Sequence, residues 1–190
     1  MANVKTNKTI LIVVTLVVLL LTYLIASPYF ALYQIKKAIQ AKDADKVSQY
    51  VDYPSLRQSV KDQMNGYMMK ELSTKAKDDK SGMAAAGALL ASTMVNSMVD
   101  GFVTPQGLKM AFDGKSMNPM ANTTDQPTQT PNKLANFNDS YDTQMGYKSI
   151  NQFYVTLNDK KQANKSMDVI LERDGLSWKI KAVQLPMDNN

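Results

Sequence analysis

The longest apolar run of the chain lies near its start, and the pattern of polar and apolar residues then changes twice. Residues 9–26 read TILIVVTLVVLLLTYLIA, without a charged residue, a glycine or a proline. As a helix rising about 1.5 Å per residue, this run spans roughly 27 Å, close to the hydrocarbon core of a bilayer. Residues 27–112 carry apolar side chains at helical spacing, and alternation follows near the C-terminus. This order predicts a transmembrane helix, several further helices and a C-terminal sheet.

A permanent anchor and a cleaved signal peptide both contain such an apolar run. In a signal peptide the run is usually about 7–15 residues long and ends at a pair of small residues. Here, cleavage after Ala26 would place Leu24 at the minus-three position, and the bond after Ser27 is followed by Pro28. The sequence therefore favours an anchor that is not cleaved.

The lysines that flank the run predict its orientation. The two nearest, Lys5 and Lys8, precede it, and three more follow within about twenty residues. Large trailing domains are exported largely regardless of their charge. We therefore expect residues 1–8 to form a cytoplasmic tail, and residues 27–190 to form one domain on the other side of the membrane, in the periplasm or at the cell exterior.

Helix-starting signals divide the stretch that follows the anchor. Ser27-Pro28 has the form of an N-cap followed by proline, so a helix restarts there or continues with a kink. Asp43 is expected to cap a short second helix. Tyr53-Pro54-Ser55 predicts the start of a third helix.

A second uncharged stretch, residues 81–99, is much less apolar than the first. Its many small and polar residues favour a buried helix of the soluble domain over a second membrane span. Thr104-Pro105 predicts a further short helix that ends near Phe112. Methionines at helical spacing are expected to fill the core rather than to line an exposed groove. They are Met64, Met68, Met69, Met83, Met94 and Met98.

The C-terminal part begins with a polar stretch and ends in strands. Residues at about 113–140 are rich in Asn, Thr, Gln and Pro, which predicts a long loop inside the domain. Residues 152–158 and 166–172 alternate as strands do, and Arg173-Asp174-Gly175 predicts a turn into a third strand, with a bulge near Lys181 or Ala182. The predicted fold class is α+β, with helices on one face of an antiparallel meander of at least three strands.

Composition narrows the chemistry that this chain can perform. Its 190 residues include no His and no Cys. These absences exclude Cys/His zinc sites, imidazole- or thiol-dependent nucleophiles and disulfides. The net charge of +5 comes mainly from dispersed lysines, whereas nucleic-acid binding would favour clustered arginines with aromatic residues. We expect no cofactor, no metal, no nucleic-acid partner and no enzymatic activity, with a carboxylate-dependent enzyme as the weakest alternative.

Four residues are the candidate contacts for a ligand or a partner. Asp52 and Arg57 flank a predicted helix start, where they could pair at a binding rim or serve as a cap and a brace. Phe153 and Trp178, the only tryptophan, would line any pocket between the helices and the strands. The other possibility is that Trp178 anchors the core of the sheet.

Three stretches of the chain resemble one protein family. They are residues 27–64, 98–112 and 175–186, and the run YVDYPSLR at residues 50–57 is the most specific part. The chain resembles an uncharacterised bacterial domain-of-unknown-function family of small proteins with one N-terminal membrane segment. The resemblance implies an envelope protein of a Gram-negative bacterium, anchored in the inner membrane with its domain in the periplasm, and it implies no activity or site residue.

The order of elements also resembles the cone-shaped α+β folds of the nuclear-transport-factor-two or cystatin-like type, which often hold a pocket between the sheet and the helices.

The sequence leaves two main hypotheses for the function. The first is a single-pass membrane protein whose periplasmic domain is a non-enzymatic interaction or structural module for another envelope protein. The alternative is a periplasmic domain that binds a small molecule or a lipid between its helices and its sheet.

Overall fold

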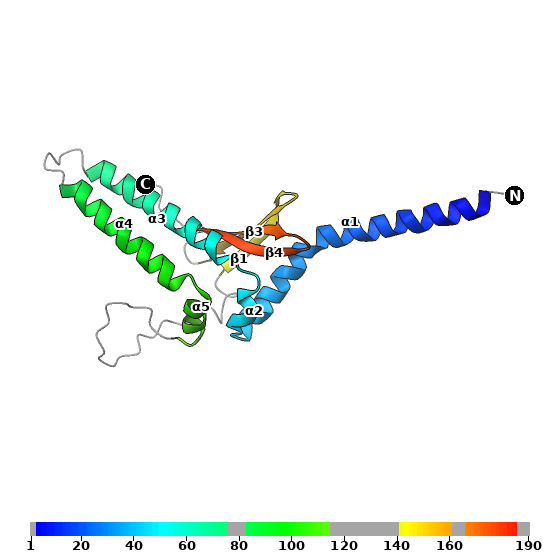
Figure 1. Ribbon diagram of the computed structural model, residues 1–190, viewed down its shortest axis with the longest axis horizontal. Coiled ribbons are helices and arrows are strands. Elements are labelled where there is room, and N and C mark those ends of the chain that lie inside the picture. The colour runs from blue at the N-terminus through cyan, green and yellow to red at the C-terminus, as the bar shows by residue number, and fades with distance from the viewer. Residues whose placement is uncertain (1–2, 76–82, 115–140, 161–165, 186–190) are drawn as a thin grey trace.

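The computed structural model describes residues 3–75, 83–114, 141–160 and 166–185, and it confirms the α+β fold class (Figure 1). The helices are α1 (Asn3–Gln40), α2 (Ala44–Ser48), α3 (Tyr53–Lys75), α4 (Met83–Phe102) and α5 (Pro105–Phe112). The strands are β1 (Tyr141–Ser149), β2 (Gln152–Asp159), β3 (Ser166–Asp174) and β4 (Ser177–Gln184). Apart from its first two residues, the predicted polar loop at 113–140 lies outside the described residues.

The sheet is an antiparallel meander in the order β1-β2-β3-β4. Leu171 pairs with Ile180 but Ile170 pairs with Ala182, so Lys181 is the extra residue and the predicted bulge is confirmed. The turn before β4 contains Gly175, whose φ of 63° suits a residue without Cβ. The sequence did not predict β1. Most of its side chains are exposed, so it lacks the apolar alternation that marks the other strands.

The helix α1 is continuous from the apolar run into the domain. It passes through Pro28 without a break, so the expected continuation with a kink is observed and the expected restart is not. Figure 1 shows its N-terminal part projecting alone, and the helix changes direction where it meets the sheet. Beyond this point Ala31 and Ile35 pack against the sheet residues Phe153 and Leu171, which forms the main core.

A smaller core joins the end of α1 to α2 and α5. Ala38, Ala44, Val47 and Phe112 are its buried members. Both predicted caps of these short helices are confirmed. The Asp43 carboxylate accepts a bond from the backbone N–H of Lys46 at 2.9 Å, and the Thr104 hydroxyl accepts one from the N–H of Gly107 at 3.0 Å.

The outer edge of β4 is covered by the segment that leads into α3. Asp52 N–H donates to the Ile180 carbonyl at 2.9 Å, and Ile180 N–H donates to the Tyr50 carbonyl at 2.7 Å. Further along the edge, the Gln63 side chain donates to the Val183 carbonyl and accepts from the Leu185 N–H. These bonds satisfy backbone groups that an open edge would leave unpaired, and they hold α3 along the sheet.

The helix α4 is not the buried core helix that its sequence predicts. Among its described side chains only Val99 is buried, whereas Leu89 and Leu90 are 73% and 71% exposed. Met69, Met94 and Met98 are exposed as well, so the expectation of core methionines is wrong for these three, and the side chain of Met83 lies outside the described part. Within the described residues, α1 is the one helix long and apolar enough to cross a membrane.

Candidate functional site

The structure places the two aromatic candidates, Phe153 and Trp178, inside the core. Both side chains are 0% exposed. Their ring centroids lie 6.3 Å apart in an edge-to-face arrangement, and Tyr147 contacts both rings from β1 at 5.1 and 6.0 Å. Neither ring presents surface to a ligand in this conformation, and their role as ligand contacts stays a prediction.

The two charged candidates turn to different partners. Asp52 accepts a bond from the Ser55 N–H at 3.2 Å and lies 4.0 Å from the Lys181 ammonium, so it connects the start of α3 to β4. Arg57 instead faces α4, with its Nε 4.0 Å from an Asp100 oxygen. Asp52 therefore has the geometry of a helix cap, and Arg57 has that of a brace between two helices. Their role in binding stays a prediction.

A polar joint connects α1 to the sheet at the point where the apolar run ends. Pro28 has no N–H, so the Leu24 carbonyl one turn earlier lacks its helical partner. Three donors reach this carbonyl: the Ser27 hydroxyl at 2.9 Å, the Tyr147 hydroxyl at 3.2 Å and the Arg173 Nη2 at 3.2 Å. The freed carbonyl thus becomes an attachment point for two strands of the sheet.

Trp178 completes this joint from within the core. Its indole N–H donates to the Ser27 hydroxyl at 2.8 Å, and the Arg173 guanidinium stacks on its ring with Cζ 4.5 Å from the centroid. Burial raises the pKa of the Tyr147 phenol above its ordinary value of 10.0, although the nearby Arg173 charge opposes the shift. The phenol therefore stays protonated and able to donate at neutral pH. Sequence reasoning missed Ser27, Tyr147 and Arg173, and the only local signal was a proline inside a helix.

Polar side chains meet between α3 and α4 in their hairpin. Ser92 donates to the Asn65 side chain at 3.0 Å, and Asn65 donates to Asn96 at 3.4 Å. Nearer the sheet, the Lys61 ammonium lies 2.6 Å from an Asp100 carboxylate oxygen. Hydrogen bonds and a close ion pair therefore contribute to the contact between the two helices.

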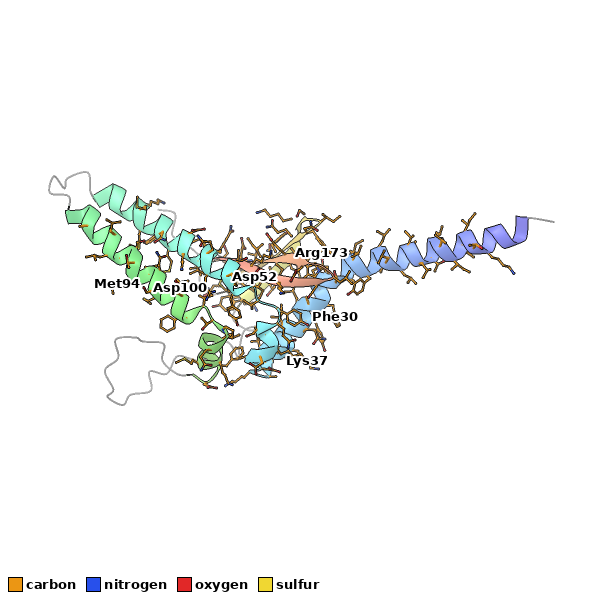
Figure 2. All side chains as sticks on the ribbon, viewed as in Figure 1. Phe30, Lys37, Asp52, Met94, Asp100 and Arg173 are labelled. Atoms are coloured by element: carbon orange, nitrogen blue, oxygen red, sulfur yellow. The ribbon has the colours of Figure 1, made fainter. Side chains whose placement is uncertain are left out.

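The opposite side of α4 carries its large apolar side chains. Leu90, Met94 and Met98 follow one another at intervals of four residues, and we call these three residues the α4 apolar face. Their exposures run from 46% to 71%, and nothing among the described residues covers them. Clustered apolar side chains of this kind mark interaction sites on protein surfaces, and methionine adapts readily to a partner's shape. Figure 2 shows Met94 at the end of the molecule away from Arg173.

Comparison with known proteins identifies a family. A family model described as "Protein of unknown function (DUF2939)" matches residues 17–111, which is half of the chain. The chain belongs to the DUF2939 family. This confirms the resemblance to an uncharacterised family that the sequence suggested. No curated protein and no solved structure gives a significant match.

The DUF2939 match covers the α4 apolar face and part of the joint between α1 and the sheet. It begins inside the apolar run of α1 and ends within α5. It includes Leu24, Ser27 and Pro28 of the joint and the whole α4 apolar face, but it does not extend to the sheet. In the described part of the chain, no three acidic residues gather as a possible metal site. The expectation of no metal, no cofactor and no enzymatic activity stays a prediction for this DUF2939 protein.

Proposed function

We propose that this DUF2939 protein is a single-pass protein of the bacterial inner membrane whose periplasmic domain binds another envelope protein through the α4 apolar face. The observation that carries this proposal is the exposure of Leu90, Met94 and Met98 on a helix whose Ser92 and Asp100 side chains bond to α3. A partner that covers these side chains would remove apolar surface from water, which is the main favourable contribution to protein association.

The way α1 enters the domain supports permanent anchoring over signal-peptide cleavage. Ser27 and Pro28 are buried within a continuous helix, so the folded domain includes the helix that carries the apolar run. The carbonyls of Leu24 and Ile25 are also bound to side chains of the sheet, with the Tyr147 hydroxyl 2.9 Å from the Ile25 oxygen. Cleavage after Ala26 would remove Leu24 and Ile25, and the mature domain would lose these bonds.

The proposed orientation rests on the flanking charges. Lys5 and Lys8 lie directly before the apolar run, on the side that positive residues keep in the cytoplasm. The domain that follows would then be exported, with the α4 apolar face available to proteins of the periplasm or of the same membrane.

Site-specific crosslinking in intact cells tests the proposed docking face. Because the chain has no cysteine, Leu90→Cys and Met94→Cys each provide a single attachment point for a photo-crosslinker. Lys37→Cys on α1 is the matched control, since Lys37 is also exposed on a helix and lies away from Met94 in Figure 2. We expect the same adduct from positions 90 and 94 and none from position 37.

A second set of variants links the adduct to the apolar surface. Leu90→Gln, placed in the Met94→Cys chain, should reduce the adduct because it makes the neighbouring surface polar. An adduct of twice the mass of the chain would replace the proposed partner with a second copy of this protein. Equal labelling at all three positions, or no adduct at 90 and 94, would remove the basis of the proposal.

The alternative of a pocket between the helices and the sheet gains no support from a specific observation. Phe153 and Trp178 would have to line that pocket, and both are enclosed by neighbouring rings and by α1. The interaction module is therefore the single proposed function.

A further inference from the structure

The turns of the two β-hairpins at one end of the sheet carry exposed aliphatic side chains. Ile150, in the turn between β1 and β2, is 81% exposed, and Leu176, in the turn between β3 and β4, is 68% exposed. Neither side chain is needed to fill the core, and turns favour polar residues or glycine at such positions. Two exposed aliphatic residues at neighbouring turns therefore indicate that another surface covers them.

Hydrogen bonds fix these turns beside the end of the apolar run. The Arg173 Nη2 lies 3.2 Å from the Leu24 carbonyl and 3.5 Å from the Ile150 carbonyl, so one guanidinium contacts both segments. Arg173 N–H also donates to the Asn151 carbonyl at 2.9 Å. Figure 1 shows this end of the sheet meeting α1 where the N-terminal part of the helix begins to project. A bilayer that surrounds residues 9–26 would have its surface at the level of these turns.

The side chains around this level have the composition of a membrane interface. Tyr23, Tyr29 and Phe30 are exposed on α1, at 52%, 45% and 64%. Aromatic residues concentrate at the headgroup level of membrane proteins, where their rings contact both the chains and the headgroups. Lys148, next to the first turn, is also exposed, and a lysine near the surface is attracted to anionic lipids.

The charges near the second turn do not oppose such a contact. Asp174 is the acidic residue next to this turn, and its carboxylate is paired with the Lys179 ammonium at 2.9 Å. The pairing reduces the repulsion that a free carboxylate would have with anionic headgroups.

We infer that Ile150 and Leu176 insert into the headgroup layer of the bilayer and form a second membrane contact beside the α1 span. This inference rests on the membrane anchoring in the proposed function and goes beyond it, because an anchored domain could otherwise stand clear of the membrane. Together with the joint at Leu24, the contact sets the orientation of the domain. It directs the hairpin of α3 and α4, at the opposite end of the molecule in Figure 1, away from the lipid.

Depth-dependent fluorescence quenching on the full-length protein tests this inference. Single cysteines at Ile150, Leu176, Leu16 and Leu89 are each labelled with a polarity-sensitive fluorophore. The labelled proteins are reconstituted into vesicles of equal parts phosphatidylcholine and phosphatidylglycerol that contain nitroxide lipids, with the nitroxide either near the headgroup or deep in the chains. Leu16 lies within the apolar run and reports the span, and Leu89 is the exposed aliphatic control far from α1.

The expected pattern separates the three locations. Labels at positions 150 and 176 should lose most of their fluorescence to the shallow nitroxide and little to the deep one. The label at position 16 should respond chiefly to the deep nitroxide, and the label at position 89 to neither. If position 16 responds while 150 and 176 do not, the turns stay in water and the inference is wrong, although the anchor stands. If position 16 does not respond either, the anchoring in the proposed function fails, and the inference fails with it.

A further variant excludes insertion that the label itself causes. A fluorophore attached through Lys148→Cys is compared in the native chain and in a chain with Ile150→Ser and Leu176→Ser. Both serine substitutions lie in exposed turns, where little effect on folding is expected. Shallow quenching at position 148 should fall strongly in the serine chain, and unchanged quenching would overturn the role of the two turn residues.

Discussion

The joint between α1 and the sheet differs from the hairpin of α3 and α4 in what it buries. At the joint, Trp178 and Phe153 are fully enclosed, and the indole N–H and the carbonyl that Pro28 leaves free both have partners, whereas Arg173 Nη1 is buried without one among the described residues. In the hairpin, amide and hydroxyl groups from Asn65 and Ser92 meet at the seam, while Leu90, Met94 and Met98 face outward. The joint is enclosed within one chain, and the hairpin leaves apolar surface uncovered.

This difference separates a stabilising region from one suited to association. A helix retained only for stability would bury its largest apolar side chains, because that burial is the main source of folding free energy. In α4 the described leucines are among the most exposed residues of that kind, at 73% and 71%. Changes at the joint should therefore destabilise the fold, and changes on the α4 apolar face should alter binding with little effect on folding.

Trp178→Ala is expected to have the largest effect on stability. It removes a fully buried ring that packs on Phe153 and stacks with Arg173, together with the bond to Ser27. Large-to-small changes of this kind reduce the free energy of unfolding by about 3–5 kcal/mol. Urea unfolding of the full chain in detergent, followed by circular dichroism, would measure the loss. Trp178→Phe keeps most of the ring and should lose much less, whereas equal losses from both variants would mean that packing at this site is unimportant.

Ser27→Ala should have the next largest effect. It leaves the buried indole N–H of Trp178 without its acceptor and removes one donor from the Leu24 carbonyl. An unsatisfied buried donor lowers stability by about 1–3 kcal/mol. The same substitution in a Trp178→Phe chain tests the reason, because no indole N–H is left to satisfy. If the loss is the same in both backgrounds, the bond between Ser27 and Trp178 does not stabilise the joint.

Local patterns in the sequence predicted most of the fold. The alternation at Phe153, Val155 and Leu157 places three buried residues on one face of β2, as the structure shows. Asp43 and Thr104 act as caps because their short oxygen-bearing side chains reach free N–H groups at helix starts. In each case the deciding interactions lie within a few residues along the chain, so the pattern contains the necessary information.

The joint could not be predicted because its bonds are long-range in sequence. Trp178 and Ser27 are 151 residues apart, and Arg173 and Leu24 are 149 residues apart. Local reasoning interpreted Ser27 as an N-cap, yet its hydroxyl instead joins a helix carbonyl to an indole. No periodicity shows which donors will meet a carbonyl that a proline has freed.

The prediction that α4 is buried was wrong for a different physical reason. An uncharged, partly apolar helix indicates that something covers it, and the pattern is the same whether the covering surface belongs to this chain or to another molecule. Only the fold shows that Leu90 and Met94 have no cover among the described residues. The composition of the helix therefore supports the proposed docking face as well as it supported a core.

The double variant Leu90→Gln, Met94→Gln should change stability by less than about 0.5 kcal/mol, as surface substitutions usually do. Val99→Ala is the matched control on the same helix. Because Val99 is buried, this substitution should lower the free energy of unfolding by about 1–2 kcal/mol. Both would be measured by the urea unfolding used for Trp178. A strong destabilisation by the two glutamines would mean that this face contributes to the fold itself, and the contrast between joint and hairpin would no longer hold.

The smallest expected effect belongs to Asp174→Asn, beside the turn that carries Leu176. The hydrogen bond from Lys179 at 2.9 Å holds the pKa of the Asp174 carboxyl below its ordinary value of 3.8, and the same contact raises the pKa of the Lys179 ammonium above 10.5. The contribution of the pair to folding stability is thus fully present between pH 3.8 and pH 10.5, the two ordinary pKa values. It is lost on the acidic side as Asp174 protonates through its lowered pKa, and on the basic side as Lys179 deprotonates through its raised pKa.

Thermal unfolding at neutral pH, in low and in high salt, would show whether this pair belongs with the joint. Both groups are exposed to solvent, so salt screens their attraction, and the small decrease in Tm caused by Asp174→Asn should vanish in high salt. The losses caused by Trp178→Ala and Ser27→Ala depend on packing and on a buried hydrogen bond, and they should persist. A decrease for Asp174→Asn that matches Ser27→Ala and survives high salt would extend the stabilising region from the buried joint to the turn beside it.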